Sequence, residues 1–152
     1  YIMKTIAGTG LRVGELKYVT VSAITDGYTQ IWNKGKYRYI YFSERLCEEL
    51  LQYCNNAGIS EGIIFIGRKE GKVITSAAVW KGLKGIAKEL GIPEETVSPH
   101  SFRHLFAKNY MEKVGDITEL ADILGHSRLE TTWIYTKTSS VEKRKRLGLL
   151  DL

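Results

Sequence analysis

Two arginines and a tyrosine are the residues of this sequence best suited to chemistry on a phosphate. They lie in three short segments: GTGLRVGEL (8–16), SPHSFRH (98–104) and LGHSRLETTWIYTK (124–137). The guanidinium groups of Arg12 and Arg103 match phosphate oxygens and could grip one phosphodiester together. Tyr135 supplies a phenolic oxygen that could attack the phosphorus. No metal or nucleotide motif competes with this set.

The first histidine of the second segment could assist that chemistry. His100 and Arg103 are three residues apart, which places them about 60° apart around a helix axis, on one face. His100 also follows Pro99 at an expected helix start, where backbone N–H groups and the helix dipole favour an anion. Imidazole can exchange a proton with a nucleophile or a leaving group near neutral pH.

The histidines also allow a different site, a zinc ion bound by His100, His104 and His126. The HExxH zinc signature, however, needs a glutamate at the position of Ser101. Arg103, between two of these histidines, would also repel a divalent cation. We therefore expect no metal.

Spacing alone leaves the role of Tyr135 open. His126 and Tyr135 are nine residues apart, so one unbroken helix would place them about 180° apart around its axis. The chain would have to turn at Gly125 and over 127–130 for both to meet one phosphate. Otherwise Tyr135 is an ordinary core tyrosine, His100 a structural histidine, and the arginines are surface or salt-bridging residues.

The elements that would position these residues are mainly helical. Apolar spacing and capping residues predict helices over 1–7, 13–18, 43–56, from Thr75 or Ser76 to Gly91, and over 99–114, 116–125, 129–135 and 141–147. β-prone segments over 28–32 and 37–42 flank the turn NKGK (33–36) and predict a hairpin, and 62–66 is a short strand candidate. The expected fold class is α+β, mainly helical with a small antiparallel β-sheet.

Length and composition are those of one globular domain. A chain of 152 residues, 43% hydrophobic and 26% charged, can bury a self-sufficient core. It has no apolar run long enough to cross a bilayer and no signal-peptide pattern, so we expect a soluble, cytoplasmic protein without a membrane partner. The sequence begins within an apolar helical pattern that has no capping residue ahead of it, which predicts an N-terminally truncated single domain over 1–152.

The spacing of the two cysteines agrees with a cytoplasmic protein, and the net charge indicates the kind of partner. Cys47 and Cys54 would lie about 10 Å apart on one helix, beyond disulfide reach, and are expected to be reduced core thiols. The net charge of +5 favours a polyanionic partner.

Four segments in series resemble the signature boxes of the tyrosine recombinases, also called the phage integrase family. They are GTGLRVGEL, NKGKYRYIYF, HSFRH and LGHSRLETTWIYTK, and the resemblance covers nearly the whole chain. It implies the catalytic-domain fold of that family and a site-specific DNA recombinase, the integrase of a mobile element. Such an enzyme cleaves and rejoins DNA strands through a 3′-phosphotyrosine intermediate without a cofactor. Two alternatives are a type IB topoisomerase and a catalytically silent DNA-binding module.

The resemblance also implies roles for individual residues. It assigns the phosphate clamp to Arg12 and Arg103, the H-x-x-R histidine to His100, the third-box phosphate contact to His126 and the nucleophile to Tyr135. Lys34 matches the hairpin lysine that protonates the leaving 5′ oxygen, but the turn is one residue shorter than usual, so Lys36 is a possible substitute. Glu15 and His104 match supporting positions.

The implied partner is double-stranded DNA, held by a basic face. Its candidate residues are Lys36, Arg38, Arg68, Lys69, Lys72, Lys81 and Lys84. The tail over 141–152 resembles the segment that the family often passes to a neighbouring protomer in a DNA-bound homotetramer, although docking on its own domain is equally compatible with the sequence. We also expect the N-terminal DNA-binding domains usual in the family to be missing from this chain.

Overall fold

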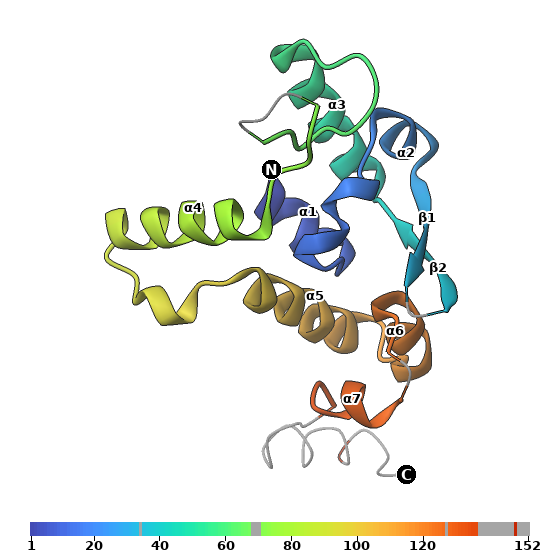
Figure 1. The fold of residues 1–152 in the computed structure, drawn as a ribbon. Coiled ribbons are helices and arrows are strands. Elements are labelled where there is room, and N and C mark those ends of the chain that lie inside the picture. Colours follow the sequence, from blue (N-terminus) through green and yellow to red (C-terminus); the bar gives the residue numbers. More distant parts are fainter. Residues whose placement is uncertain (34, 68–70, 127, 137–147, 149–152) are drawn as a thin grey trace.

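In the first half of the chain a two-stranded sheet lies at the edge of the molecule beside helices, and the named elements of the second half are all helices (Figure 1). The computed structural model describes residues 1–33, 35–67, 71–126, 128–136 and 148. The first half contains α1 (Ile2–Thr9), the 3-10 helix η1 (Val13–Tyr18), α2 (Val21–Asp26), β1 (Tyr28–Asn33), β2 (Lys36–Tyr41) and α3 (Glu44–Ala57). The second half contains α4 (Ser76–Glu89), the 3-10 helix η2 (Glu94–Thr96), α5 (Pro99–Lys113), α6 (Ile117–Leu124) and α7 (Glu130–Trp133). The predicted fold class is confirmed. Within the described ranges, every helix is too short or too polar to span a bilayer.

Side-chain caps fix where many of the helices begin. The first turns of α2, α3, α4, α5 and α6 donate backbone N–H groups to the side chains of Thr20, Ser43, Thr75, Ser98 and Asp116. Each cap satisfies donors that the first turn of a helix leaves unpaired. The predicted helix starts at Ser43, Thr75 and Pro99 are therefore confirmed.

The β1–β2 hairpin has one buried face and one exposed face. Its antiparallel register pairs Ile31 with Arg38 and Thr29 with Ile40. Ile31, Arg38 and Ile40 are buried. The alternate positions carry exposed aromatic side chains: Tyr28, Trp32, Tyr37, Tyr39 and Tyr41. The buried face therefore includes one charged residue among apolar ones.

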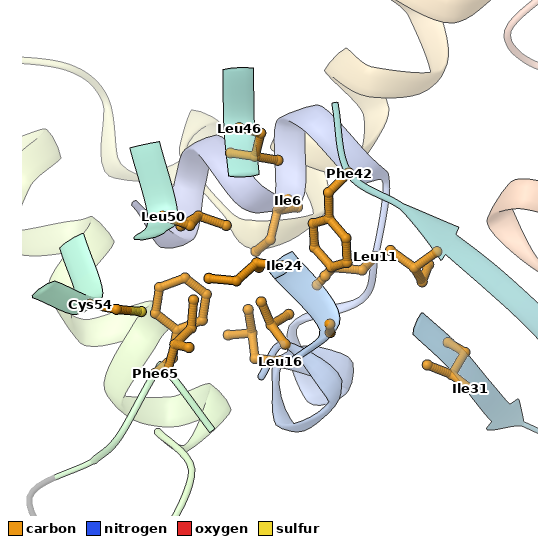
Figure 2. Packing of buried hydrophobic residues seen from close by; sticks show 14 of the residues in the cluster. Ile6, Leu11, Leu16, Ile24, Ile31, Phe42, Leu46, Leu50, Cys54 and Phe65 are labelled. Atoms are coloured by element: carbon orange, nitrogen blue, oxygen red, sulfur yellow. The ribbon is translucent and has the colours of Figure 1, made fainter. Parts of the chain in front are cut away.

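The larger core lies between α1, α2, α3 and the hairpin (Figure 2). Ile6, Leu16, Ile24 and Leu50 are at most 1% exposed within it. Burying a side chain of this kind stabilises a fold by about 1.5–3 kcal/mol. Cys54 is buried in the same core, and both it and Cys47 are free thiols, as predicted.

A smaller apolar cluster joins α5 to α6, and α1 packs along α5 beside it. Gly10, which ends α1 with a φ of 67°, makes this approach possible. A Cβ atom at Gly10 would lie 2.5 Å from Cδ1 of Phe106 and 3.0 Å from Cδ2 of Leu124. The two cores are therefore brought together at a position that has no room for a side chain.

Three local predictions differ from the structure. The sequence patterns give no helix over 21–26, where α2 forms between the capping residue Thr20 and Gly27. The strand predicted over 62–66 is wrong: this segment makes only the isolated bridges Thr20–Ile63 and Ile66–Val73, and its residues Ile64 and Phe65 enter the larger core. Helix α7 is shorter than the predicted 129–135. The helix predicted over 141–147 lies outside the described residues.

Replacing Gly10 with alanine is expected to lower the free energy of unfolding by about 2–5 kcal/mol. The new Cβ would press on Phe106, and alanine disfavours the left-handed backbone. Gly58→Ala is a matched control, since Gly58 has a φ of 68° but open space around it, and should cost only about 1–2 kcal/mol. Urea unfolding monitored by circular dichroism measures both, and equal losses would contradict the close approach.

Candidate active site

One cleft of about 430 Å³ collects the residues predicted from the three segments. Its lining residues come from the segment after α1, the first half of α5, the turn after α6, and α7 with the residues that follow it. Arg12, His100, Arg103, His126 and Tyr135 all line it. Its other lining residues are His104, Gly125, Arg128, Thr131 and Ile134.

Arg103 is the most deeply buried of these site residues, with 6% of its surface exposed. Its guanidinium donates hydrogen bonds to the backbone carbonyls of Gly10 and Leu124, the second over 2.6 Å. Both carbonyls lie at helix ends, where intrahelical donors run out and the helix dipole is negative. Burial, followed by the charges of Arg12 and Arg38, lowers the pKa of Arg103 to about 10, so it stays charged at neutral pH.

Glu15 sets the position of Arg12. Its carboxylate accepts a hydrogen bond from the backbone N–H of Arg12 over 2.7 Å and another from Nη1 over 3.2 Å. It also accepts one from Nη2 of Arg38 over 2.5 Å. Burial alone would raise the pKa of Glu15, but the hydrogen bonds and charges of these two arginines outweigh it, and the pKa is lowered. Glu15 is therefore an ionised anchor for Arg12.

Arg38 is buried, and the prediction that it contacts DNA from the surface is wrong. Only 9% of the residue is exposed, because its guanidinium pairs with Glu15 and donates to the backbone carbonyl of Ile123. A Cβ atom at Gly125 would lie 2.6 Å from Cδ of Arg38, and Gly125 ends α6 with a φ of 64°. Arg38 is thus a positioning residue that ties the hairpin to the turn before His126.

His126 is held as a neutral imidazole. Burial, followed by the charges of Arg103 and Arg12, lowers the pKa of His126 to about 4. Its Nε2 lies 3.3 Å from Nη2 of Arg103, which can only donate, so Nε2 accepts. Its Nδ1 then carries the proton and donates to Oγ1 of the buried Thr132 over 2.8 Å. The same arginines that disfavour a charged His126 would attract an anion to the cleft.

The turn after α6 brings Tyr135 into the cleft, as the spacing argument requires. Its ring packs on the smaller apolar cluster, and its hydroxyl forms a 2.7 Å hydrogen bond with Nδ1 of His104. Burial raises the pKa of Tyr135, and the charge of Arg103 offsets this only in part, so the phenol is protonated at neutral pH. His100 is exposed in the first turn of α5, with its ring centroid 6.2 Å from that of His104.

Three of the candidate DNA-binding lysines belong to the part of the chain that the structure describes, and none of these three lines the cleft. Lys72, Lys81 and Lys84 are exposed, on α4 or shortly before it. The residues Lys34, Arg68 and Lys69 and the side chain of Lys36 lie outside what the structure describes. The choice between Lys34 and Lys36 therefore stays a prediction.

Sequence reasoning misses two residues of the site. Arg128 adds a further exposed cation to the cleft, and its charge within the third segment was the available signal. Thr132 fixes the tautomer of His126, a role that depends on the chain turn and leaves no sequence signal. Across the described ranges, no three His, Cys, Asp or Glu side chains are grouped to hold a metal ion.

Comparisons with known proteins place these features in a family. A sequence model described as "Phage integrase family" matches residues 1–142. The tyrosine recombinase XerD of Listeria innocua is 33% identical over 150 residues, which cover 92% of this chain and 50% of that protein. The chain thus spans about half the length of the curated relatives it matches.

Two solved structures share the fold. The crystal structure of XerA recombinase has a TM-score of 0.77 and 24% identity, and the match covers 100% of this chain and 58% of that one. The Tn1549 transposon integrase in complex with transposon right end DNA has a TM-score of 0.76 and 18% identity, covering 97% of this chain and 57% of that one. The predicted fold of a recombinase catalytic domain is confirmed.

His126 is expected to titrate near pH 4 in the free protein. Between about pH 6.5 and about pH 4 the unfolded chain binds a proton on this residue and the folded chain does not, so this contribution to stability falls as the pH drops. NMR of the ring protons, assigned with His126→Gln, measures the pKa. Arg12→Gln should raise it by removing a nearby charge, and titration of His126 at the ordinary histidine value would contradict the neutral state.

Arg38→Met is expected to lower the free energy of unfolding by about 3 kcal/mol, because it removes one partner of a buried ion pair. Arg45→Met is a matched control: Arg45 is 89% exposed on its side chain, is also paired with a glutamate, and should cost less than about 1 kcal/mol. Urea unfolding of both variants tests this. A loss at Arg38 as small as that at Arg45 would contradict its positioning role.

Proposed function

The chain belongs to the phage integrase family, and on that premise we propose that it is the catalytic part of a site-specific DNA recombinase. It would cleave and rejoin DNA strands through a 3′-phosphotyrosine intermediate. The observation that carries the proposal is the position of the Tyr135 hydroxyl in the same cleft as Arg12 and Arg103. A module that only binds DNA has no need for a tyrosine beside a phosphate clamp.

The two arginines would divide the work of holding the phosphate. Arg12 keeps 34% of its side chain exposed, so it can meet an incoming DNA phosphate, whereas Arg103 is fixed by backbone carbonyls on the buried side. Donors aimed at the charge that develops in a transition state are each worth about 3–4 kcal/mol. Because both arginines are placed before substrate arrives, little reorganisation would be needed during the reaction.

Cleavage would be a transesterification. The Oη atom of Tyr135 attacks the phosphorus, the bond to the 5′ oxygen breaks, and that oxygen takes a proton from the hairpin lysine, Lys34 or Lys36. His126 would contact a non-bridging oxygen, and the negative phosphate would offset the arginine charges that lower its pKa. The new phosphotyrosine bond conserves the energy of the broken one, so rejoining is the same step in reverse without ATP.

Double-stranded DNA is the proposed substrate. The net charge of +5, the exposed lysines Lys72, Lys81 and Lys84 and the cations of the cleft support it, and the transposon integrase of the same fold is complexed with DNA. Docking of residues 141–152 on a neighbouring protomer in a homotetramer falls outside the described residues and stays a prediction.

Tyr135→Phe is expected to abolish covalent capture of DNA while leaving DNA binding intact. The measurement uses a library of nicked duplexes, on which the cleaved strand stays trapped on the protein as an SDS-resistant adduct. The duplexes that form adducts also show the sequence preference. Tyr110→Phe is the matched control, because Tyr110 packs in the same apolar cluster but does not line the cleft. An adduct formed by the Tyr135 variant would assign the nucleophile elsewhere, and relaxation of supercoiled DNA without a preferred site would favour the topoisomerase alternative.

A further inference from the structure

The hydroxyl of Tyr135 is hydrogen-bonded to His104, a residue to which the family resemblance assigns only a supporting position. The hydroxyl oxygen lies 2.7 Å from Nδ1 of His104, and the two ring centroids are 5.4 Å apart. That distance is short enough for direct proton transfer between the two groups. By contrast, the sequence favours His100 as the residue that exchanges a proton with the nucleophile or the leaving group.

The helix α5 explains why His104 meets the tyrosine. His100 and His104 are four residues apart on α5, so they lie on one face and both open onto the cleft. His104 is one turn further along the helix and contacts the segment that follows α7. Arg103, its neighbour in sequence, points instead to the buried helix ends. Arg103 therefore belongs to the phosphate clamp, whereas His104, the next residue of α5, contacts the nucleophile.

We propose that His104 orients the phenol of Tyr135 and takes up its proton during DNA cleavage. This inference rests on the proposed function and adds the proton acceptor to it. The proton moves from Oη to Nδ1 of His104 as the oxygen–phosphorus bond forms, while the 5′ oxygen leaves with a proton from a separate donor. On rejoining, Nδ1 returns the proton to Oη as the phosphotyrosine bond breaks.

The state of the phenol makes an acceptor necessary. Burial raises the pKa of Tyr135, so the hydroxyl enters the reaction protonated. The charged or titratable groups that share the cleft are Arg12, His100, Arg103, His126, Arg128 and Tyr135.

Two substitutions separate orientation from proton transfer. His104→Ala removes both, whereas His104→Asn can keep a hydrogen bond at the position of Nδ1 but cannot take up a proton. Because His104 is exposed, both variants are expected to fold, which circular dichroism checks. Asn109→Ala, an exposed position on the same helix outside the cleft, is the matched control and should cleave at the unaltered rate.

The rate of covalent adduct formation is measured on nicked duplexes with oxygen or sulfur at the bridging 5′ position. We expect both His104 variants to cleave at least about a hundredfold more slowly than the unaltered chain on either duplex. A sulfur leaving group needs no proton. Sulfur at the bridging position therefore restores the cleavage rate only of a variant that is defective in protonating the leaving group. The dependence of the rate on pH should lose its acidic limb in both variants.

Three results would overturn the proposal. Unaltered cleavage by His104→Ala would show that the contact has no role, and rescue by sulfur would place His104 on the leaving-group side. A full rate for His104→Asn would leave orientation alone as its role. If the unaltered chain forms no adduct on any duplex of the library, the proposed function itself fails, which is distinguishable from all three.

Discussion

The buried charge of Arg103 is the constraint on which the site depends. A guanidinium that is almost fully enclosed must have hydrogen-bond partners, and Arg103 finds them in the carbonyls at the ends of α1 and α6. These carbonyls have no helical donors of their own, so one side chain satisfies two helix ends and locks them against α5. Arg12 comes shortly after the end of α1 and His126 shortly after the end of α6, so fixing these two helix ends also fixes both residues.

Arg38 fixes the hairpin in the same way, through a buried guanidinium with hydrogen-bond partners on other elements. Its guanidinium joins β2 to the end of α6 and to Glu15, which in turn holds Arg12. Gly125 leaves room for its side chain, as Gly10 leaves room for Phe106. Arg12 and Arg38 thus share the Glu15 carboxylate, while Arg38 and Arg103 donate to backbone carbonyls close by. Burial, together with the positive charge of these arginines, lowers the pKa of His126 and keeps its imidazole neutral.

Much of the fold follows from local signals in the sequence. Ser43, Thr75 and Pro99 mark helix starts because a cap or a fixed φ acts within one turn. The hairpin follows from alternating side chains around Gly35. The segment over 62–66 is misleading because an apolar run reports burial and not the presence of a strand to pair with. Helix α2 lies between the capping residue Thr20 and Gly27, and it packs against α3.

The sequence by itself determined which side chains are available for phosphate chemistry, and its four segments indicated the family. Only the tertiary structure decided what each side chain contacts. Arg38 looks like any basic surface residue in sequence, but its register places it on the buried face of the hairpin. His104, not His100, meets Tyr135 because the segment after α7 reaches α5 one turn beyond His100. Such contacts join residues distant in the chain, and no local periodicity or capping preference encodes them.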